Sequence, residues 1–210
     1  YDALASHGNQ ITGKGLASST IRGIHSMLHE ALDAAKQAGL IPWNPTEEIP
    51  PPKFTCKAKQ ILTDEQLDIF MAIIQQDDIW HDFLYTELTT GLRRGEICGL
   101  KWTDFNEADS TLKVRRTIHQ ETGGELTAWD TKTTAGTRTI ILPPSTVELL
   151  RERQKSALTE WIFPDPLRPE QPTRPSAAYN RMKSLLKAAG LPDLRFHDLR
   201  HTFATCLLYT

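Results

Sequence analysis

Three consecutive prolines, Pro50 to Pro52, constrain the fold of this chain more than any other feature of its sequence. Proline has no backbone N–H to donate, and its ring clashes with the preceding helical turn, so a helix cannot run through this stretch. A run of prolines instead favours an extended and stiff path. We therefore predict a first segment at residues 1–49, a linker at 50–60 and a larger domain at 61–210.

Helical periodicity dominates the first segment between Ser19 and Ala38, where apolar residues recur every three or four positions. Ser18 or Ser19 is placed to cap the start of this helix, and Gly39 is placed to end it. A single helix cannot bury its own apolar stripe. We therefore expect residues 1–49 to be part of a small helical domain.

The larger domain begins and ends with helical patterns. Thr63 and Gln66 form the ends of a capping-box sequence, with apolar residues following on one helical face. A glycine at position 190 is placed to end a later helix. Helices are expected at about these ranges: 63–74, 79–89, 94–100, 145–154, 176–189 and from His197 onward.

Strand patterns fill the middle of the larger domain. Apolar and polar residues alternate from Leu112 to His119, which predicts a strand, and Gly123-Gly124 marks a turn. Two further strands are expected at 127–129 and 137–142. The order of helices, strands and helices predicts an α+β fold that is mostly helical, with a small antiparallel sheet.

Composition excludes few function classes. The 210 residues carry 24 Lys and Arg against 26 Asp and Glu, a net charge of −2. Residues 61–110 contain an excess of acidic side chains, and the remainder is positive, so a locally basic binding surface is compatible with this total. There is no apolar run long enough for a membrane span, and the first residues lack the basic start and apolar middle that are typical of a signal peptide. Three widely separated cysteines fit a reducing compartment, and we expect a cytoplasmic protein.

Motifs for common cofactor and metal chemistry are absent from the sequence. It has no phosphate-binding Walker loop, no GxGxxG and no HExxH, and the seven histidines are not spaced as metal ligands with cysteines. It also has no G-x-S-x-G serine elbow. We therefore expect no cofactor and no metal.

Three separated clusters of basic residues are the strongest candidates for chemistry. They are TGLRRGEI at residues 90–97, TKTTAGTR at 131–138 and HDLRHT at 197–202. Each cluster taken alone is more typical of solvated surface residues or, in the third, of a helix terminus than of a catalytic site. Together, two arginines, a lysine and a histidine can bind phosphate oxygens and move a proton without a metal. The combination predicts a site that stabilises a phosphoryl-transfer transition state.

These segments resemble the motifs of the tyrosine recombinases, or phage-type integrases, especially those of conjugative transposons and prophages. The resemblance rests on TGLRRGEICGLKW at 90–102, TKTTAGTRTIIL at 131–142 and HDLRHTFAT at 197–205. Residues 18–45 are similar to the end of the family's helical core-binding domain. The resemblance implies a mostly helical catalytic domain at 61–210. It also implies a partial DNA-binding domain at 1–49.

The resemblance assigns roles to particular residues of this sequence. Arg93 and Arg200 match the catalytic arginines, and Lys132 matches the lysine that protonates the leaving 5′-oxygen. His197 matches the histidine of the H-x-x-R pair. The implied reaction cuts and rejoins DNA at a specific site through a 3′-phosphotyrosyl intermediate. Supporting roles are expected for Glu96 and His201.

The family's nucleophilic tyrosine has no match in the sequence. Tyr209 lies nine residues beyond Arg200, which on one helix is half a turn away and about 13 Å along the axis. We therefore expect Tyr209 not to be the nucleophile. We also expect the chain to be truncated at both ends and inactive in cleavage. An alternative left open is a DNA-binding fragment or remnant that occupies recombination sites without cutting them.

The expected partner is double-stranded DNA at recombination sites, bound by a tetramer in the full-length protein. Such proteins are encoded by bacteria, phages and other mobile genetic elements. Thr20, Arg22 and His25, on the helix of the first segment, are candidate DNA contacts. The DNA sequence that is recognised, and the direction of recombination, do not follow from these residues.

Overall fold

The computed structural model describes residues 1–51, 53, 61–130 and 137–209, with the backbone alone at residues 130 and 203–209. The chain divides into two compact units, Tyr1–Ala58 (unit 1) and Lys59–Thr210 (unit 2). The division falls within residues 50–60, the predicted linker, most of which lies outside the described residues.

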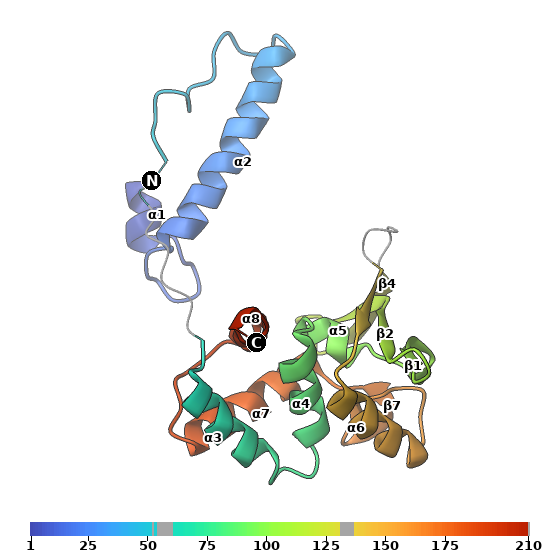
Figure 1. The fold of residues 1–210 in the computed structure, drawn as a ribbon. Helices are drawn as coiled ribbons and strands as arrows, with labels where there is room; N and C mark the ends of the chain where they lie inside the picture. The colour runs from blue at the N-terminus through green and yellow to red at the C-terminus, as the bar shows by residue number, and fades with distance from the viewer. Residues whose placement is uncertain (52, 54–60, 131–136, 210) are drawn as a thin grey trace. The chain divides into compact units, whose positions relative to one another are not determined.

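Unit 1 contains two helices, α1 (Asp2–His7) and the longer α2 (Ser18–Gln37) (Figure 1). The helix predicted at 19–38 is confirmed to within one residue. Gly39, just beyond its end, has a φ of +71°, the left-handed conformation that commonly follows a helix. The expected serine cap is wrong, because the residue before α2 is Ala17 and no side chain caps the helix start.

A network of polar side chains ties the loop after α2 back onto this helix. The amide of Asn44, which is fully buried, donates to the carbonyl of His29 at 3.1 Å. The Nδ1 atom of His29 hydrogen-bonds the hydroxyl of Thr46 at 2.8 Å. The Nδ1 atom of His25 hydrogen-bonds the hydroxyl of Tyr1 at 2.6 Å. Buried polar groups are costly unless they are paired, so these bonds explain why a small unit tolerates them.

Unit 2 begins and ends with helices, as predicted. Thr63 and Gln66 form the predicted capping box, in which the Thr63 hydroxyl accepts the Gln66 N–H and the Gln66 side chain accepts the Thr63 N–H. Gly190 has a φ of +66° just beyond the end of a helix. The helices are α3 (Asp64–Ile74), α4 (His81–Thr90), α5 (Arg94–Cys98), the 3₁₀ turn η1 (Trp102–Asp104), α6 (Pro144–Lys155), α7 (Pro175–Ala188) and α8 (Phe196–Tyr209).

The strands of unit 2 form three small antiparallel sheets in the described residues, where the sequence predicted one. The first sheet has the order β1-β2-β5, the second pairs β3 with β4, and the third pairs β6 with β7. The strands are β1 (Phe105–Asn106), β2 (Thr111–Val114), β3 (Arg116–Gln120), β4 (Leu126–Asp130), β5 (Arg138–Ile141), β6 (Pro164–Asp165) and β7 (Arg168–Pro172).

The prediction of one continuous strand from Leu112 to His119 is wrong in one respect. The chain leaves the first sheet after Val114 and enters the second at Arg116, so the alternation spans two strands that pair with different partners. Leu112, Val114 and Ile118 are nevertheless all buried. The alternation therefore predicted which side chains face the core, although it did not reveal the change of sheet.

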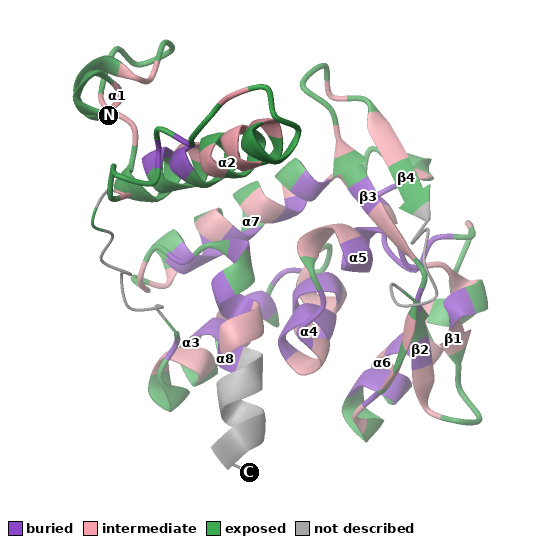
Figure 2. Cartoon of the chain, turned by 90° about the horizontal axis from the view of Figure 1, so that it is seen from above, coloured by how far each residue is buried: buried purple, intermediate pink, exposed green. Residues whose placement is uncertain are grey.

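The core of unit 2 lies between its helices and its strands. Figure 2 shows buried residues concentrated along α4 and on the inner sides of α5 and α7. Helix α4 packs against α3, α6 and α8, and α5 packs against β3. Phe83 on α4 makes edge contacts with Phe163 and with Phe196 at the start of α8. These contacts fix the ends of α4, α5 and α8 relative to one another.

Gly95 allows α5 to lie directly on β3. A Cβ atom at this position would come within 2.6 Å of the Thr117 Cγ2 atom and 2.7 Å of the Ile118 carbonyl oxygen. The carbonyl belongs to the backbone of a paired strand and cannot easily move. We therefore expect Gly95→Ala to lower the free energy of unfolding by about 1–3 kcal/mol through overpacking.

Urea denaturation of the two alanine variants tests this expectation. Gly123→Ala is the matched control, because a Cβ atom at Gly123 meets nothing within 4 Å. The control should unfold at the same urea concentration as the parent chain. A Gly95→Ala variant as stable as the control would contradict the direct packing of α5 on β3.

Candidate active site

Arg93 stands at the start of α5 with most of its side chain in solvent. Its side chain is 60% exposed, and its Nη1 donates to the Glu96 Oε1 at 2.9 Å. The backbone N–H of Arg93 donates to the Glu96 Oε2, also at 2.9 Å. Glu96 thus holds both the backbone and the guanidinium of Arg93, an arrangement that the three-residue spacing allows on the first helical turn.

Glu96 also joins α5 to β5 through an ion pair that the sequence analysis did not predict. Arg138 donates from Nη1 and Nη2 to the two carboxylate oxygens, at 2.8 Å and 2.6 Å. Burial acts to raise the pKa of Glu96, but the hydrogen bonds from Arg138 and Arg93 outweigh it and lower the pKa to about 2. Glu96 is therefore an anion at neutral pH, clamped between two arginines.

Arg200 on α8 reaches back to the turn that precedes Arg93. Its Nη1 donates to the carbonyl oxygen of Gly91 at 2.6 Å. Gly91 ends α4 in the left-handed conformation, with a φ of +58°, which glycine adopts without the strain that a Cβ atom brings. The first and third basic clusters of the sequence therefore meet at this carbonyl.

Glu87 lies beneath the same turn, with its carboxyl group inside the protein. The side chain is fully buried, and neither carboxyl oxygen has a hydrogen-bond partner among the described residues. Burial raises the pKa of Glu87 well above its usual range, the charge of Arg200 lowers it, and the charge of Glu96 raises it further. The balance favours a protonated, neutral carboxyl group close to Arg200 and Glu96.

His197 and His201 lie one turn apart on α8, the helix that carries Arg200. Their ring centroids are 4.8 Å apart and the rings are nearly perpendicular. His197 is exposed. Asp198 accepts the backbone N–H of Arg195 at 2.9 Å at the start of the helix. Asp193, in the turn before this helix, pairs with Lys183.

Lys132 and Tyr209 are the two remaining residues that the sequence analysis singled out. Lys132, the expected general acid, lies outside the described residues. Tyr209 is the last residue of α8, so it shares one helix with Arg200, as the sequence predicted. The position of its side chain is not among the described features.

Arg138 and Glu87 are the site residues that sequence reasoning missed. Arg138 was within the second basic cluster, at the end of TKTTAGTR, but nothing local linked it to Glu96, which is 42 residues away. Glu87 carried a detectable signal, because it falls between the buried Leu84 and Leu88 on the inward face of α4. An acidic residue at such a position is an exception that calls for a partner or a shifted pKa.

The three candidate DNA contacts in unit 1 differ in exposure. Thr20 and Arg22 are exposed on α2. His25 is 8% exposed and bonded to the Tyr1 hydroxyl, so its ring belongs to the internal network of unit 1. A direct role for the His25 side chain in DNA contact is therefore not retained, and the other two residues remain predictions.

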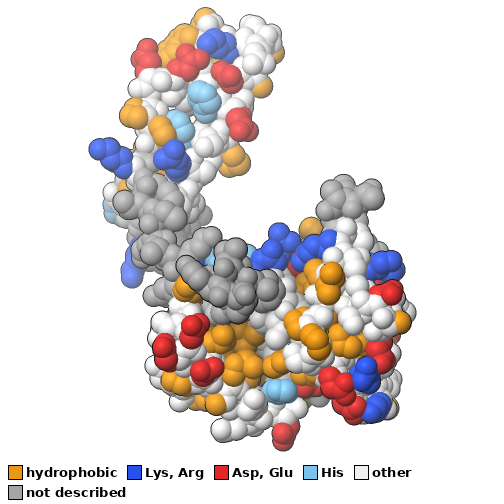
Figure 3. Space-filling view, in the orientation of Figure 1, with side chains coloured by type: hydrophobic (Ala, Val, Ile, Leu, Met, Phe, Trp, Pro, Cys, Tyr) orange, Lys and Arg blue, Asp and Glu red, His pale blue; other side chains and the backbone are white. Residues whose placement is uncertain are grey.

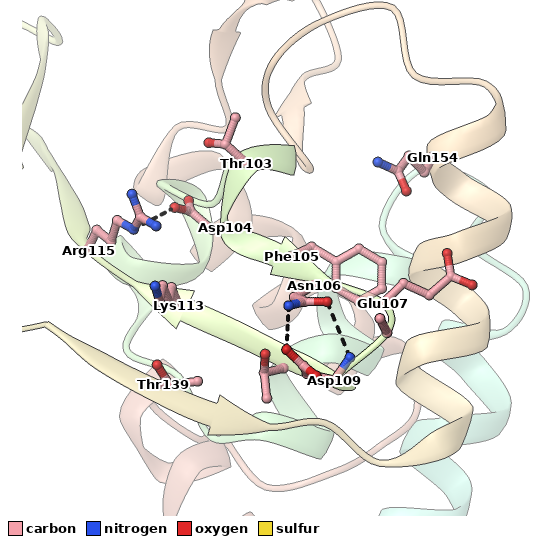
Figure 4. A pocket seen from close by; sticks show the side chains of 12 residues that line it. Thr103, Asp104, Phe105, Asn106, Glu107, Asp109, Lys113, Arg115, Thr139 and Gln154 are labelled. Carbon is pink, nitrogen blue, oxygen red and sulfur yellow. Dashed lines mark hydrogen bonds and ion pairs between the residues drawn. The ribbon is translucent and has the colours of Figure 1, made fainter.

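The arginine cluster lies at the surface and lies outside the hollow beside β1 and β2. Figure 3 shows lysine and arginine side chains gathered on the surface above α5. A hollow of about 890 Å³ lies beside β1 and β2 and is lined by Asp104, Glu107, Lys113 and Arg115, among others (Figure 4). This hollow contains none of the candidate site residues. Within the described ranges, no group of three or more His, Cys, Asp or Glu could hold a metal ion, and no helix could cross a membrane.

Residues 60–210 match the family described as the phage integrase family. The chain belongs to this family, the tyrosine recombinases. The matched range covers well over half of the chain and contains Arg93, Glu96, His197 and Arg200. The family assignment that the motifs predicted is thereby confirmed.

Curated integrases and recombinases match the chain along most of its length. The tyrosine recombinase XerC-like protein of Caldanaerobacter subterraneus subsp. tengcongensis is 26% identical, over 95% of this chain and 58% of that protein. The ICEBs1 integrase of Bacillus subtilis is 24% identical, over 93% of the chain and 55% of that protein. The chain thus spans about half the length of these integrase relatives.

Solved integrase structures share the fold. The Tn1549 transposon integrase, in complex with transposon right end DNA, superposes with a TM-score of 0.80 at 24% identity, over 93% of this chain and 68% of that one. A lambda integrase tetramer bound to a Holliday junction gives a TM-score of 0.64 at 23% identity, over 90% of this chain and 54% of that one. The predicted catalytic-domain fold of this integrase family is confirmed.

Proposed function

We propose that this chain belongs to a site-specific DNA recombinase that cuts and rejoins DNA through a 3′-phosphotyrosyl intermediate. The observation that carries the proposal is the junction at residues 91–96, where Arg93 is held by Glu96 and Arg200 is held by the Gly91 carbonyl. The two arginines come from α5 and α8, far apart in sequence. Their convergence on one turn supports a shared task.

That task is the binding of one phosphate group of the DNA backbone. Guanidinium groups present forked donors that match phosphate oxygens, and both Arg93 and Arg200 keep donors beyond the bonds described above. In the transition state the phosphate gains negative charge, and donors already in place stabilise it without reorganisation. His197 would add a further donor, and Lys132 would protonate the leaving 5′-oxygen.

The energy of the cut bond is conserved in this reaction. A tyrosine hydroxyl attacks the phosphorus, the 5′-oxygen leaves with a proton, and the covalent phosphotyrosine keeps the bond available for rejoining. The reverse step uses a 5′-hydroxyl as nucleophile and releases the tyrosine. Within residues 1–210 we assign no residue as this nucleophile, since Tyr209 shares a helix with Arg200 at an unsuitable spacing.

The two units would divide the work on DNA. Unit 2 would carry the chemistry. Unit 1 would supply part of the core-binding domain, with Thr20 and Arg22 of α2 contacting the duplex. The full-length protein would assemble as a tetramer on recombination sites, as lambda integrase does in its structure on a Holliday junction.

Salt-dependent binding of duplex DNA tests the core of the proposal. For a protein that neutralises several phosphates, the logarithm of the binding constant falls linearly with the logarithm of the salt concentration. The slope is about −0.9 for each phosphate contact. We expect this behaviour for the 210-residue chain, measured by fluorescence anisotropy with a labelled duplex. Arg22→Ala should weaken binding and reduce the slope by about one contact.

Lys36→Ala is the matched control, because Lys36 is also exposed on α2 but is engaged by Glu47 at 2.8 Å. The control should bind duplex with the slope of the parent chain. No salt-dependent duplex binding by the parent chain would overturn the proposed function. Equal effects of the two substitutions would overturn the specific role of Arg22.

A further inference from the structure

Arg138 is bound to the carboxylate that orients Arg93, yet the family motifs assign it no role. Its two terminal nitrogens clamp Glu96, and Glu96 holds both the backbone N–H and the guanidinium of Arg93. We propose that Arg138 is a positioning residue that acts through Glu96 to keep Arg93 oriented and electrostatically available for a DNA phosphate. The proposal rests on the proposed function and extends it.

Arg138 can orient Glu96, and through it Arg93, because its own backbone is held in a strand. Arg138 is the first residue of β5, and it pairs with Val114 of β2, so its backbone is fixed in a sheet. A forked two-bond contact then fixes both oxygens of Glu96, which a single bond would leave free to rotate. The sheet, the carboxylate and Arg93 therefore form a rigid chain of contacts ending at the exposed guanidinium.

Arg138 also changes the net charge around Arg93, whatever its effect on orientation. Glu96 is 5% exposed, so water screens its charge weakly. Without Arg138, Arg93 and Glu96 would form a neutral pair, and Arg93 would attract an anion less strongly. With Arg138 the three groups carry one net positive charge. Among the described residues, the guanidinium of Arg93 bonds Glu96 through Nη1 alone, which leaves its other donors for a ligand.

The exposure of the two arginines agrees with this division of roles. The Arg93 side chain is 60% exposed, whereas that of Arg138 is 34% exposed, with both terminal nitrogens directed at Glu96. Arg93 is therefore the residue that meets the ligand. Arg138 acts behind it, through the carboxylate.

A charge-compensation experiment on the 210-residue chain tests the proposal. We expect Arg138→Ala to weaken duplex binding at low salt by about tenfold, since it leaves Arg93 neutralised by Glu96. Adding Glu96→Gln to this variant should restore most of the affinity, because a glutamine oxygen can still accept from Arg93 but carries no charge. Arg138→Lys should lie between the parent chain and Arg138→Ala. It also covers the case in which the alanine variant fails to fold.

Arg151→Ala is the control for loss of a surface charge. Arg151 pairs with Glu107 and Glu148 on an exposed part of α6, and its removal should leave affinity close to that of the parent chain. Affinity unchanged by Arg138→Ala would overturn the proposal. So would a double variant that binds no better than Arg138→Ala alone, because a purely structural role predicts additive damage.

The titration of Glu96 separates this proposal from the proposed function. Carbon-detected NMR should place the pKa of Glu96 at about 2 in the parent chain and higher in Arg138→Ala, where the strongest hydrogen bonds to the carboxylate are gone. A parent chain that binds no duplex would overturn the proposed function and the phosphate-binding role with it. The Glu96 pKa would still report whether Arg138 holds the carboxylate, and an unchanged value would overturn that step.

Discussion

Arg93→Ala and Arg200→Ala are each expected to slow strand cleavage by about 10²–10³-fold, the loss typical when one preorganised donor is removed from a transition state. Arg93 projects from the junction at residues 91–96, Arg200 reaches this junction from α8, and hydrogen bonds hold both arginines there. Duplex affinity should fall by only about tenfold, since many other phosphate contacts contribute to it. Loss of rate without matching loss of affinity is the signature of a group that acts mainly in the transition state.

The measurement is covalent capture of a nicked duplex by the product of the complete open reading frame, with the adduct resolved on a denaturing gel. Tyr209→Phe should leave capture intact, because Tyr209 is nine residues beyond Arg200 on the same helix. Arg151→Ala, on the exposed surface of α6, should also leave it intact.

Each possible result decides a different assignment. Cleavage that persists in Arg93→Ala or Arg200→Ala would contradict the active-site assignment. Adduct formation that is lost in Tyr209→Phe would identify Tyr209 as the nucleophile. A complete gene product that binds duplex but never forms the adduct would favour site occupancy over recombination.

The sequence predicted the parts of this site that depend on local patterns. Helical periodicity placed α2, α3 and α4 within about two residues of their observed ends, and the capping box marked the start of α3. The segment TGLRRGE contains Arg93 and Glu96 three residues apart, a spacing that already brings them together on one turn. Local spacing was therefore enough for the Arg93–Glu96 contact.

Contacts between distant segments could not be read from spacing. Arg200 meets Gly91 across 109 residues, and Arg138 meets Glu96 across 42. The family motifs implied the first meeting, because they place both arginines in one site. Nothing comparable pointed to the second. Similarly, the alternation at 112–119 predicted burial but not the switch between two sheets at Arg115, since burial depends on the face and pairing depends on the partner strand.

Glu87 is the clearest case of a residue whose behaviour requires the fold, and Glu87→Gln is expected to stabilise the chain increasingly as pH rises. The carboxyl group is fully buried and has no hydrogen-bond partner in the described residues. Burial raises its pKa well above the usual range of a glutamate, although the charge of Arg200 opposes this effect. The folded state therefore keeps the proton at pH values where the unfolded state has released it.

The sign of the pH dependence follows from proton counting. Between the unfolded pKa and the raised folded pKa, the folded state binds more protons than the unfolded state, so stability falls as pH rises, by at most about 1.4 kcal/mol per pH unit from this group. Below the unfolded pKa both states are protonated and the penalty vanishes. Glutamine never ionises, so the variant should lose this downward slope. The pKa of Glu96 is lowered to about 2, so its titration changes stability only at pH values below the unfolded pKa of a glutamate. It therefore does not mask the pH dependence that comes from Glu87.

Urea denaturation at several pH values between 4 and 8 measures the difference in free energy of unfolding between Glu87→Gln and the parent chain. Thr86→Val is the matched control, because the neighbouring Thr86 hydroxyl is also buried and unpartnered in the described residues but does not titrate. Its effect should be the same at every pH, whereas the advantage of Glu87→Gln should grow from pH 5 upward. A Glu87→Gln variant that is less stable than the parent chain at neutral pH would show that Glu87 is ionised and paired with Arg200. In that case Arg200 would be held by a charge from α4 as well as by the Gly91 carbonyl.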